Sequence, residues 1–302
     1  MNKIIIENNC IKENIVDSRI EIIEKSSIVS SIKIIFKEST DLKVIYSTSE
    51  DTKLNVEYIL LENVQVNLYE LRNGFKTKVQ YKYDIKSNAK LYLYRINKSN
   101  AMREVDLIDL NGVNSHIEFN LRTLSNKEEK YDIYVAHNEK YTSSNINNIG
   151  IALKGNIIFN VTGEISKGNS GSKLDQNNQI VTFNASKCQI NPNLLIDEYD
   201  VEAEHNAIIG KFDDQILFYL MSRGIKENDA IKLLCEGLIL NKLKESYSKE
   251  EILDFIQEYW GWKNVSWWIS NFKKWNYLFW FRCNCIKTKM YDWGNKWLLF
   301  KL

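Results

Sequence analysis

Several residue types and sequence features are scarce or missing in this chain. Its 302 residues include one proline, three histidines and five cysteines, and no tryptophan occurs before Trp260. The cysteines follow no regular spacing, so we expect reduced thiols and a cytoplasmic protein rather than a secreted disulfide framework. No apolar run is long enough to span a bilayer, and residues 7–9 interrupt the first apolar run before a signal peptide could form.

Motifs for common hydrolytic reactions are missing as well. The chain contains no G-x-x-x-x-G-K-[ST] phosphate loop, no H-E-x-x-H and no G-x-S-x-G. We therefore expect no ATP site and no enzymatic activity in this chain. The chain before Trp260 is mildly acidic, with 32 basic and 38 acidic residues, although the whole sequence has a net charge of +1. With no basic stripe carrying interleaved aromatic residues, it gives no reason to expect nucleic-acid binding.

Short alternating segments occupy most of the chain up to residue 211. Segments such as SSIKIIFKE, LKVIYST and TKVQYKYDI alternate in polarity and are rich in β-branched and aromatic residues, which predicts strands. Clusters of Asn, Gly, Ser and Asp between them predict turns. No strand–helix–strand alternation occurs, so a doubly wound fold is disfavoured, whereas a sandwich and a β-solenoid both stay open on this pattern alone.

The pattern changes to helices after residue 211. Apolar spacing predicts helices at 213–222, about 227–244 and 249–259. Asp213 or Asp214 can cap the first helix, and Gly224 can end it because glycine adopts a positive φ without strain.

Residues 200–224 form the most informative segment. Val201 and Ala203 alternate with acidic residues, which predicts a half-buried strand that leads to a turn at Gly210. This places His205 near the junction between a strand and a helix.

The same segment resembles the core signature of the SufB/SufD family, the scaffold proteins of bacterial and plastid iron–sulfur cluster assembly. The family pattern runs roughly P-x-L-x-I, then D-V-x-x-x-H-x-A-x-x-G, then D-x-Q-x-x-F-Y-L-x-S-R-G-I. The matching residues are Pro192, Leu194, Ile196, Asp200, Val201, His205, Ala207, Gly210, Asp213, Gln215, Phe218, Tyr219, Leu220, Ser222, Arg223, Gly224 and Ile225. The correspondence is best from about residue 130 onward. Asn206 and Glu204 depart from the residues usual beside this histidine.

The resemblance implies a mainly β fold with two parts. Residues 1–211 would form a right-handed parallel β-helix, and residues 212–259 a small C-terminal helical cap over the open end of the solenoid. Relatives also carry an N-terminal helical region, whereas strand-like sequence begins here at Lys3.

The last segment, 260–302, holds all eight tryptophans, eight basic residues and one acidic residue, with no periodicity. Writing most of its tryptophans as TGA codons and shifting the frame by one base gives a string that resembles the start of a SufS-type cysteine desulfurase. We predict that the native protein ends at Tyr259, and that 260–302 is an unstructured, non-native tail produced by translating TGA as tryptophan.

Two residues are candidate ligands for iron. The resemblance implies that His205 supports a transient iron–sulfur cluster at a subunit interface, since a neutral imidazole binds iron. The alternative is that His205 only completes a hydrogen bond at the strand-to-helix junction. Cys188 is a weaker candidate, because it lies about one solenoid coil before His205 but does not align with the cysteine of SufB-like relatives. His116 and His137 are predicted to be structural or surface residues.

The resemblance also implies partners: a SufB-like subunit, a SufC-like ATPase and, in the same pathway, a cysteine desulfurase. The predicted ATPase-facing residues, within 212–244, are Asp213, Gln215, Phe218, Tyr219, Arg223 and Gly224. Their apolar members could instead only pack the helices onto the solenoid.

Two further functions stay open. One is a β-helix that acts on carbohydrate, for which clustered carboxylates and secretion are not evident; the other is a purely structural interaction protein.

Overall fold

The structure is a computed structural model, and it describes residues 2–25, 30–49, 53–74, 77–99, 101–183, 187–242 and 249–260. Contacts divide the chain into two units, 1–256 and 257–302, and the account below concerns the first. Apart from the backbone of Trp260, the predicted tail at 260–302 lies outside the described residues.

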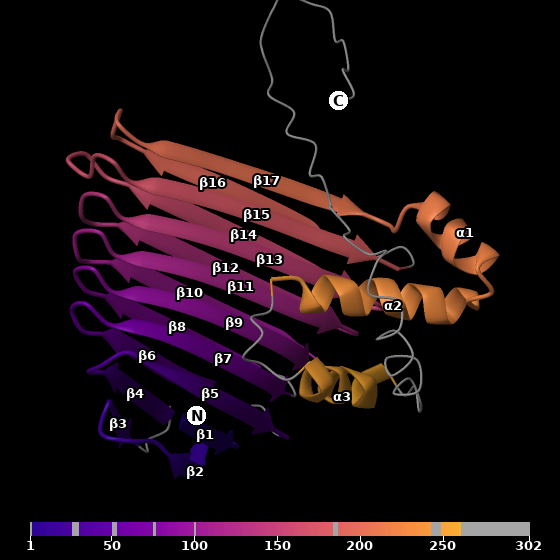
Figure 1. Cartoon of the computed structure of the whole chain (residues 1–302), viewed down its shortest axis with the longest axis horizontal. Helices are drawn as coiled ribbons and strands as arrows, with labels where there is room; N and C mark the ends of the chain where they lie inside the picture. Colours follow the sequence, from indigo (N-terminus) through magenta and orange to yellow (C-terminus); the bar gives the residue numbers. More distant parts are fainter. Residues whose placement is uncertain are drawn as a thin grey trace, which may run out of the picture. The chain divides into compact units, whose positions relative to one another are not determined.

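Seventeen strands in the described residues form two sheets (Figure 1). The nine-stranded sheet contains, in spatial order, β17 (Glu202–Gly210), β15 (Lys173–Thr182), β13 (Ser143–Ala152), β11 (His116–Ser125), β9 (Lys90–Ser99), β7 (Gln65–Gly74), β5 (Thr40–Thr48), β1 (Asn2–Glu7) and β2 (Cys10–Ile15). The eight-stranded sheet contains β16 (Gln189–Ile196), β14 (Asn156–Ile165), β12 (Glu128–His137), β10 (Met102–Leu110), β8 (Thr77–Ile85), β6 (Lys53–Leu60), β4 (Ser30–Phe36) and β3 (Ile20–Lys25).

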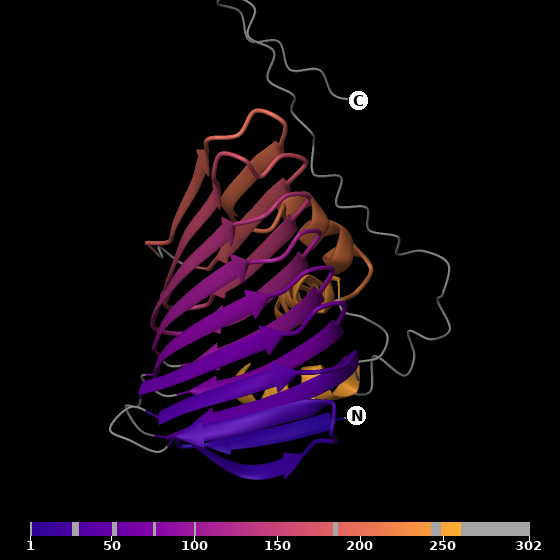
Figure 2. The ribbon, with the colours of Figure 1, turned by 90° about the vertical axis from the view of Figure 1, so that its left-hand side faces the viewer.

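The chain winds as a parallel β-solenoid, which confirms the predicted fold class. From β4 onward consecutive strands alternate between the sheets, and from β5 onward each pairs in parallel with the strand one coil earlier. Figure 2 shows the coils stacked in sequence order, from indigo to orange. Strict alternation of buried and half-exposed residues, as along β5, sends every second side chain into the space between the sheets. The alternation in the sequence thus specifies which face of each strand is buried.

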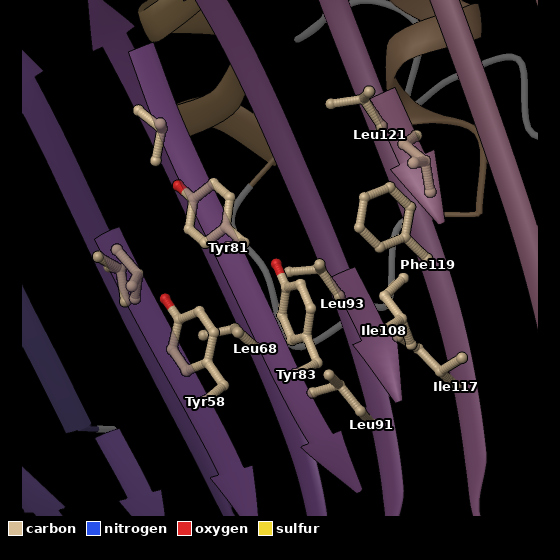
Figure 3. Close-up of a cluster of buried hydrophobic side chains, with 14 of the residues drawn as sticks. Tyr58, Leu68, Tyr81, Tyr83, Leu91, Leu93, Ile108, Ile117, Phe119 and Leu121 are labelled. Atoms are coloured by element: carbon tan, nitrogen blue, oxygen red, sulfur yellow. The ribbon is translucent and has the colours of Figure 1, made fainter. Parts of the chain in front are cut away.

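Stacked apolar and aromatic side chains fill that space (Figure 3). The ring of Tyr58 stacks on Tyr83 with centroids 5.4 Å apart, and Tyr83 meets Phe119 edge-on at 6.5 Å. Charged groups lie between these rings. Arg95 donates from Nη1 to Glu104 at 2.6 Å and to Asp106 at 2.9 Å, with all three side chains fully buried.

The two ends of the solenoid differ. At the N-terminal end the chain folds back, so that β1 pairs with β2, and β3 with β4, in antiparallel hairpins. The outer strands β2 and β3 carry charged residues at Lys12, Glu13, Glu21 and Glu24. At the other end, β16 and β17 are parallel edge strands, each paired on one side only among the described residues.

Three helices follow: α1 (Asp214–Ser222), α2 (Glu227–Leu240) and α3 (Lys249–Trp260). Asp213 caps α1 by accepting a hydrogen bond from the backbone N–H of Gln215 at 2.8 Å. At its end, Gly224 has φ +85° and donates to Met221, while Ile225 donates to Leu220, the pattern of a Schellman motif. None of these described helices is long and apolar enough to cross a membrane.

The helices do not cover the open end of the solenoid, contrary to the prediction of a cap there. The C-terminal end of α2 rests on the outer face of the nine-stranded sheet, where Arg122 donates to the carbonyl of Asn241 at 3.1 Å and Tyr94 donates to that of Ile239. Lys98 of β9 donates to the carbonyl of Phe255 in α3 at 3.1 Å. The polar outer face of β9 and β11 therefore binds the helices, and the last coil stays uncovered by them (Figure 1).

Candidate functional site

The last coil, made by β16 and β17, is the candidate functional site. His205 lies in the middle of β17, so its predicted position near a strand-to-helix junction is wrong. The strand itself ends at Gly210, where the sequence predicts a turn, and α1 begins at Asp214. The strand extends because every residue from Glu202 to Gly210 pairs in register with β15.

His205 belongs to the inward row of its strand. It pairs with Gln176 of β15, which is fully buried, and paired residues of parallel strands point to the same face of the sheet. The imidazole is nevertheless exposed, because no further coil lies over it among the described residues. His205 therefore faces the open end of the solenoid interior rather than the outside of the sheet.

Apolar residues surround this histidine at the open end. The inward row of β16 consists of Ile190, Pro192, Leu194 and Ile196, which are only half-buried, whereas the matching row of β14 is buried. Ile209, in the inward row of β17, is 46% exposed. The last coil thus presents core-like residues without a core above them, which is typical of a surface that another chain covers.

Cys188 lies at the start of β16 and away from His205. Gln176 reaches the carbonyl of Asn193 across the sheets at 3.4 Å, so Asn193 is the residue of β16 opposite the Gln176–His205 pair. Cys188 is five residues earlier, about 16 Å along the strand. Its thiol accepts from the backbone N–H of Ile157 at 3.4 Å, and burial raises its pKa, which favours the thiol over the thiolate that binds metal.

No group of three or more His, Cys, Asp or Glu side chains in the described part of the chain is arranged to hold a metal ion. His205 can offer one nitrogen ligand to an iron ion.

The other two histidines have their own partners. His137 is buried, and its ring nitrogens lie 2.7 Å from Thr142 Oγ1 and 2.8 Å from Ser144 Oγ. Burial lowers the pKa of His137 to about 4, so the ring is neutral at pH 7. The ring of His116 lies 2.7 Å from Ser143 Oγ. Both arrangements are structural hydrogen bonds.

The predicted ATPase-facing residues gather on α1, where they divide into two kinds. Asp213 and Gly224 form the start and the end of the helix. Phe218 and Tyr219 are exposed by 74% and 45%, and the guanidinium of Arg223 lies 5.3 Å from the Tyr219 ring centroid. Gln215 is exposed as well. With Met221, exposed by 43%, Phe218 and Tyr219 form an apolar surface on α1 that packing within the described chain does not use.

Sequence reasoning missed the residues beneath His205. Gln176 and Asn178 are buried in the inward row of β15, below His205 and Ala207. Polar residues at strand positions that are expected to be apolar could have indicated a special role for these two residues. Their proximity to His205 could not be predicted, because it depends on strand pairing between positions 29 residues apart.

The fold and the site define a class of protein. It is a parallel β-solenoid with a closed N-terminal end and an open, apolar C-terminal end that displays one histidine. The family model described as "SUF system FeS cluster assembly, SufBD core domain" matches residues 20–238. The chain belongs to this family.

Curated relatives agree with the family model. Iron-sulfur cluster assembly protein SufD of Bacillus subtilis is 36% identical over 104 residues, covering 33% of this chain and 24% of that protein. The SufD protein of Escherichia coli is 29% identical over 162 residues, covering 51% of this chain and 38% of that protein. An archaeal relative from Pyrococcus horikoshii, of the SufBD family, is 45% identical over 51 residues, or 17% of this chain and 11% of that protein. The matches thus span well under half the length of these relatives.

Proposed function

We propose that this chain is a cytoplasmic SufD-like subunit of an iron–sulfur cluster assembly scaffold, which acts by assembly rather than by catalysis. The observation that carries the proposal is the open last coil with His205 at its centre. It combines an unpaired pair of strand edges, exposed apolar residues and a nitrogen ligand on one surface.

The partner at this end is a SufB-like subunit that adds its own strands to β16 and β17. Edge strands are normally protected, and the N-terminal end has that protection through hairpins and charges. The last coil has Ile208 and Ile209 exposed by 44% and 46% instead. An edge kept apolar and unpaired on one side favours strand addition by another chain.

Pairing at this end would explain the single histidine. A cluster built at the interface would take one nitrogen ligand from His205 and its other ligands, thiolates among them, from the SufB-like subunit. The cluster is cargo here, with sulfur supplied by a cysteine desulfurase of the same pathway.

The exposed face of α1 is the proposed dock for a SufC-like ATPase. Phe218, Tyr219 and Met221 offer aromatic and thioether contacts of the kind enriched at interface centres. Because the chain lacks a phosphate loop, ATP would bind to this partner and not to the chain.

Co-expression with SufB-like and SufC-like proteins tests the proposal. A tagged chain should retain both after affinity purification and size exclusion, in a complex of defined stoichiometry. A chain that elutes alone, at concentrations well above micromolar, would refute the assembly role. Secretion together with carbohydrate cleavage would support the β-helix enzyme instead.

A further inference from the structure

Gln176 occupies an unusual position beneath His205. It is fully buried between the sheets, in an inward row that also holds the apolar Leu174 and Ile180 and one other polar residue, Asn178. Its amide nitrogen donates to the carbonyl of Asn193 at 3.4 Å. This bond fixes the orientation of the amide, because the nitrogen must face the carbonyl and Oε1 must then face elsewhere.

The Oε1 atom of Gln176 has no hydrogen-bond partner among the described residues. Burying an unpaired carbonyl oxygen is costly, so native structures rarely keep one without a reason. The opposite strand also makes room for the amide. A Cβ added at Gly163 would lie 2.9 Å from Gln176 Nε2 and 2.2 Å from Leu174 Cδ1, so glycine there permits the close approach.

His205 is the neighbour that can satisfy this oxygen. The two residues pair directly in the parallel ladder and point to the same face, with backbones one strand spacing apart, about 4.8 Å. An imidazole in its neutral form carries one N–H donor and one bare nitrogen. If the donor is fixed toward Gln176, the bare nitrogen is left for a ligand.

We propose that Gln176 is a positioning residue for His205. The two side chains are not hydrogen-bonded in the structure. The exposed imidazole would turn so that Gln176 Oε1 accepts its N–H and its other nitrogen faces the open end. The ligand class is a metal ion that accepts one nitrogen donor, with ferrous iron as the relevant case. This deepens the proposed function and rests on it for the identity of the ligand. The proposed hydrogen bond between the two side chains does not rest on it.

The contact can be tested on the isolated full chain, without metal or partner. The chain contains three histidines, so 15N-labelled histidine gives a small set of ring signals. At about pH 8.5, where a free imidazole is neutral, His205 should show one dominant tautomer and an observable, slowly exchanging ring N–H. The proposal would be overturned if the wild-type His205 ring sampled both tautomers and its N–H exchanged with water as fast as that of free imidazole.

Variants then assign the acceptor. Gln176→Leu should abolish the slow N–H signal and mix the tautomers, while Gln176→Glu, which keeps an acceptor oxygen, should preserve both features. Asn178→Leu is the matched control, since Asn178 is buried in the same row but pairs with Ala207. Retention of the slow N–H in Gln176→Leu would overturn the proposal. A preserved N–H contact together with failed partner binding would refute the proposed function and leave the positioning role intact.

Discussion

Arg95 shows how the solenoid tolerates charge in its interior. Its guanidinium contacts Glu70, Glu104 and Asp106 and lies 3.7 Å from the Tyr81 ring centroid. Burial raises the pKa of Asp106 well above its ordinary value; Arg95 opposes this shift and Glu104 adds to it. Burial also acts to raise the pKa of Glu104, but the charges of Arg95 and Arg72 outweigh it and lower that pKa. The buried carboxylates of the network therefore depend on the arginines as counter-ions.

Removing Arg95 should unbalance this network. We expect Arg95→Met to lower the free energy of unfolding by about 3–5 kcal/mol, because buried carboxylates lose their counter-ion. Chemical denaturation followed by circular dichroism measures the change. Lys173→Met is the control, since the Lys173–Glu202 pair is exposed by 62% and 76%, and it should cost less than about 1 kcal/mol. Similar losses in both variants would contradict the balanced-network account.

His137 should make stability depend on pH. Burial lowers its pKa to about 4 from an ordinary value of 6.5, so between these pH values the unfolded chain binds a proton that the folded chain does not. The contribution of the neutral His137 ring to the free energy of unfolding is complete above pH 6.5 and is lost as the pH falls toward 4. We expect a loss of about 3 kcal/mol relative to His137→Gln, measured by denaturation at pH 7 and pH 4. A constant difference between the two proteins would be inconsistent with a buried neutral ring.

At the scale of elements, the same substitution should affect partner binding at one end of the solenoid and not at the other. Ile209→Lys in β17 and Ile15→Lys in β2 each place a charge on an exposed isoleucine of an edge strand, with exposed fractions of 46% and 56%. We expect both to fold with unfolding free energies within about 1 kcal/mol of wild type. Only Ile209→Lys should weaken binding of the SufB-like subunit, because a lysine on an edge strand disfavours pairing with another strand. The dissociation constant from sedimentation or calorimetry should rise by at least about tenfold. Equal binding by both variants would mean that the last coil is not the interface.

The helix α1 can be tested in the same way. Phe218→Asp should weaken binding of the SufC-like ATPase by roughly thirtyfold, the usual effect of losing an aromatic hot spot, without lowering stability because Phe218 is 74% exposed. Tyr199→Asp is the control, as Tyr199 is a fully exposed aromatic residue in the β16–β17 turn. Unchanged ATPase affinity in Phe218→Asp would place the dock elsewhere.

At the scale of the whole molecule, the sequence predicted local structure better than arrangement. Alternation predicted the strands, and the start and end of α1 followed from Asp213 and Gly224, because caps depend on a few adjacent residues. The solenoid itself needed the family resemblance, since alternation fits several β folds. The predicted second helix, about 227–244, was too long: α2 ends at Leu240.

The surroundings of the candidate site could not be predicted from the sequence, because they depend on long-range strand register. The sequence indicates His205 as a candidate ligand but not its central position in β17 or the residue beneath it, because the pairing with Gln176 joins positions 29 residues apart. Helix placement failed for a related reason. The side chains that receive α2 are Tyr94 and Arg122, which lie on different strands and form one surface only after the coils stack.

The measurement that tests the central claim most directly is cluster formation on the assembled complex with His205→Ala. The variant should co-purify with its SufB-like and SufC-like partners as the wild type does, because His205 is exposed and its side chain is not part of the core. The account predicts that iron–sulfur content after reconstitution, and maturation of iron–sulfur enzymes in cells, fall to a small fraction of the wild-type level, while His116→Ala leaves both unchanged. An intact His205→Ala complex that assembles clusters at the wild-type level would contradict the account.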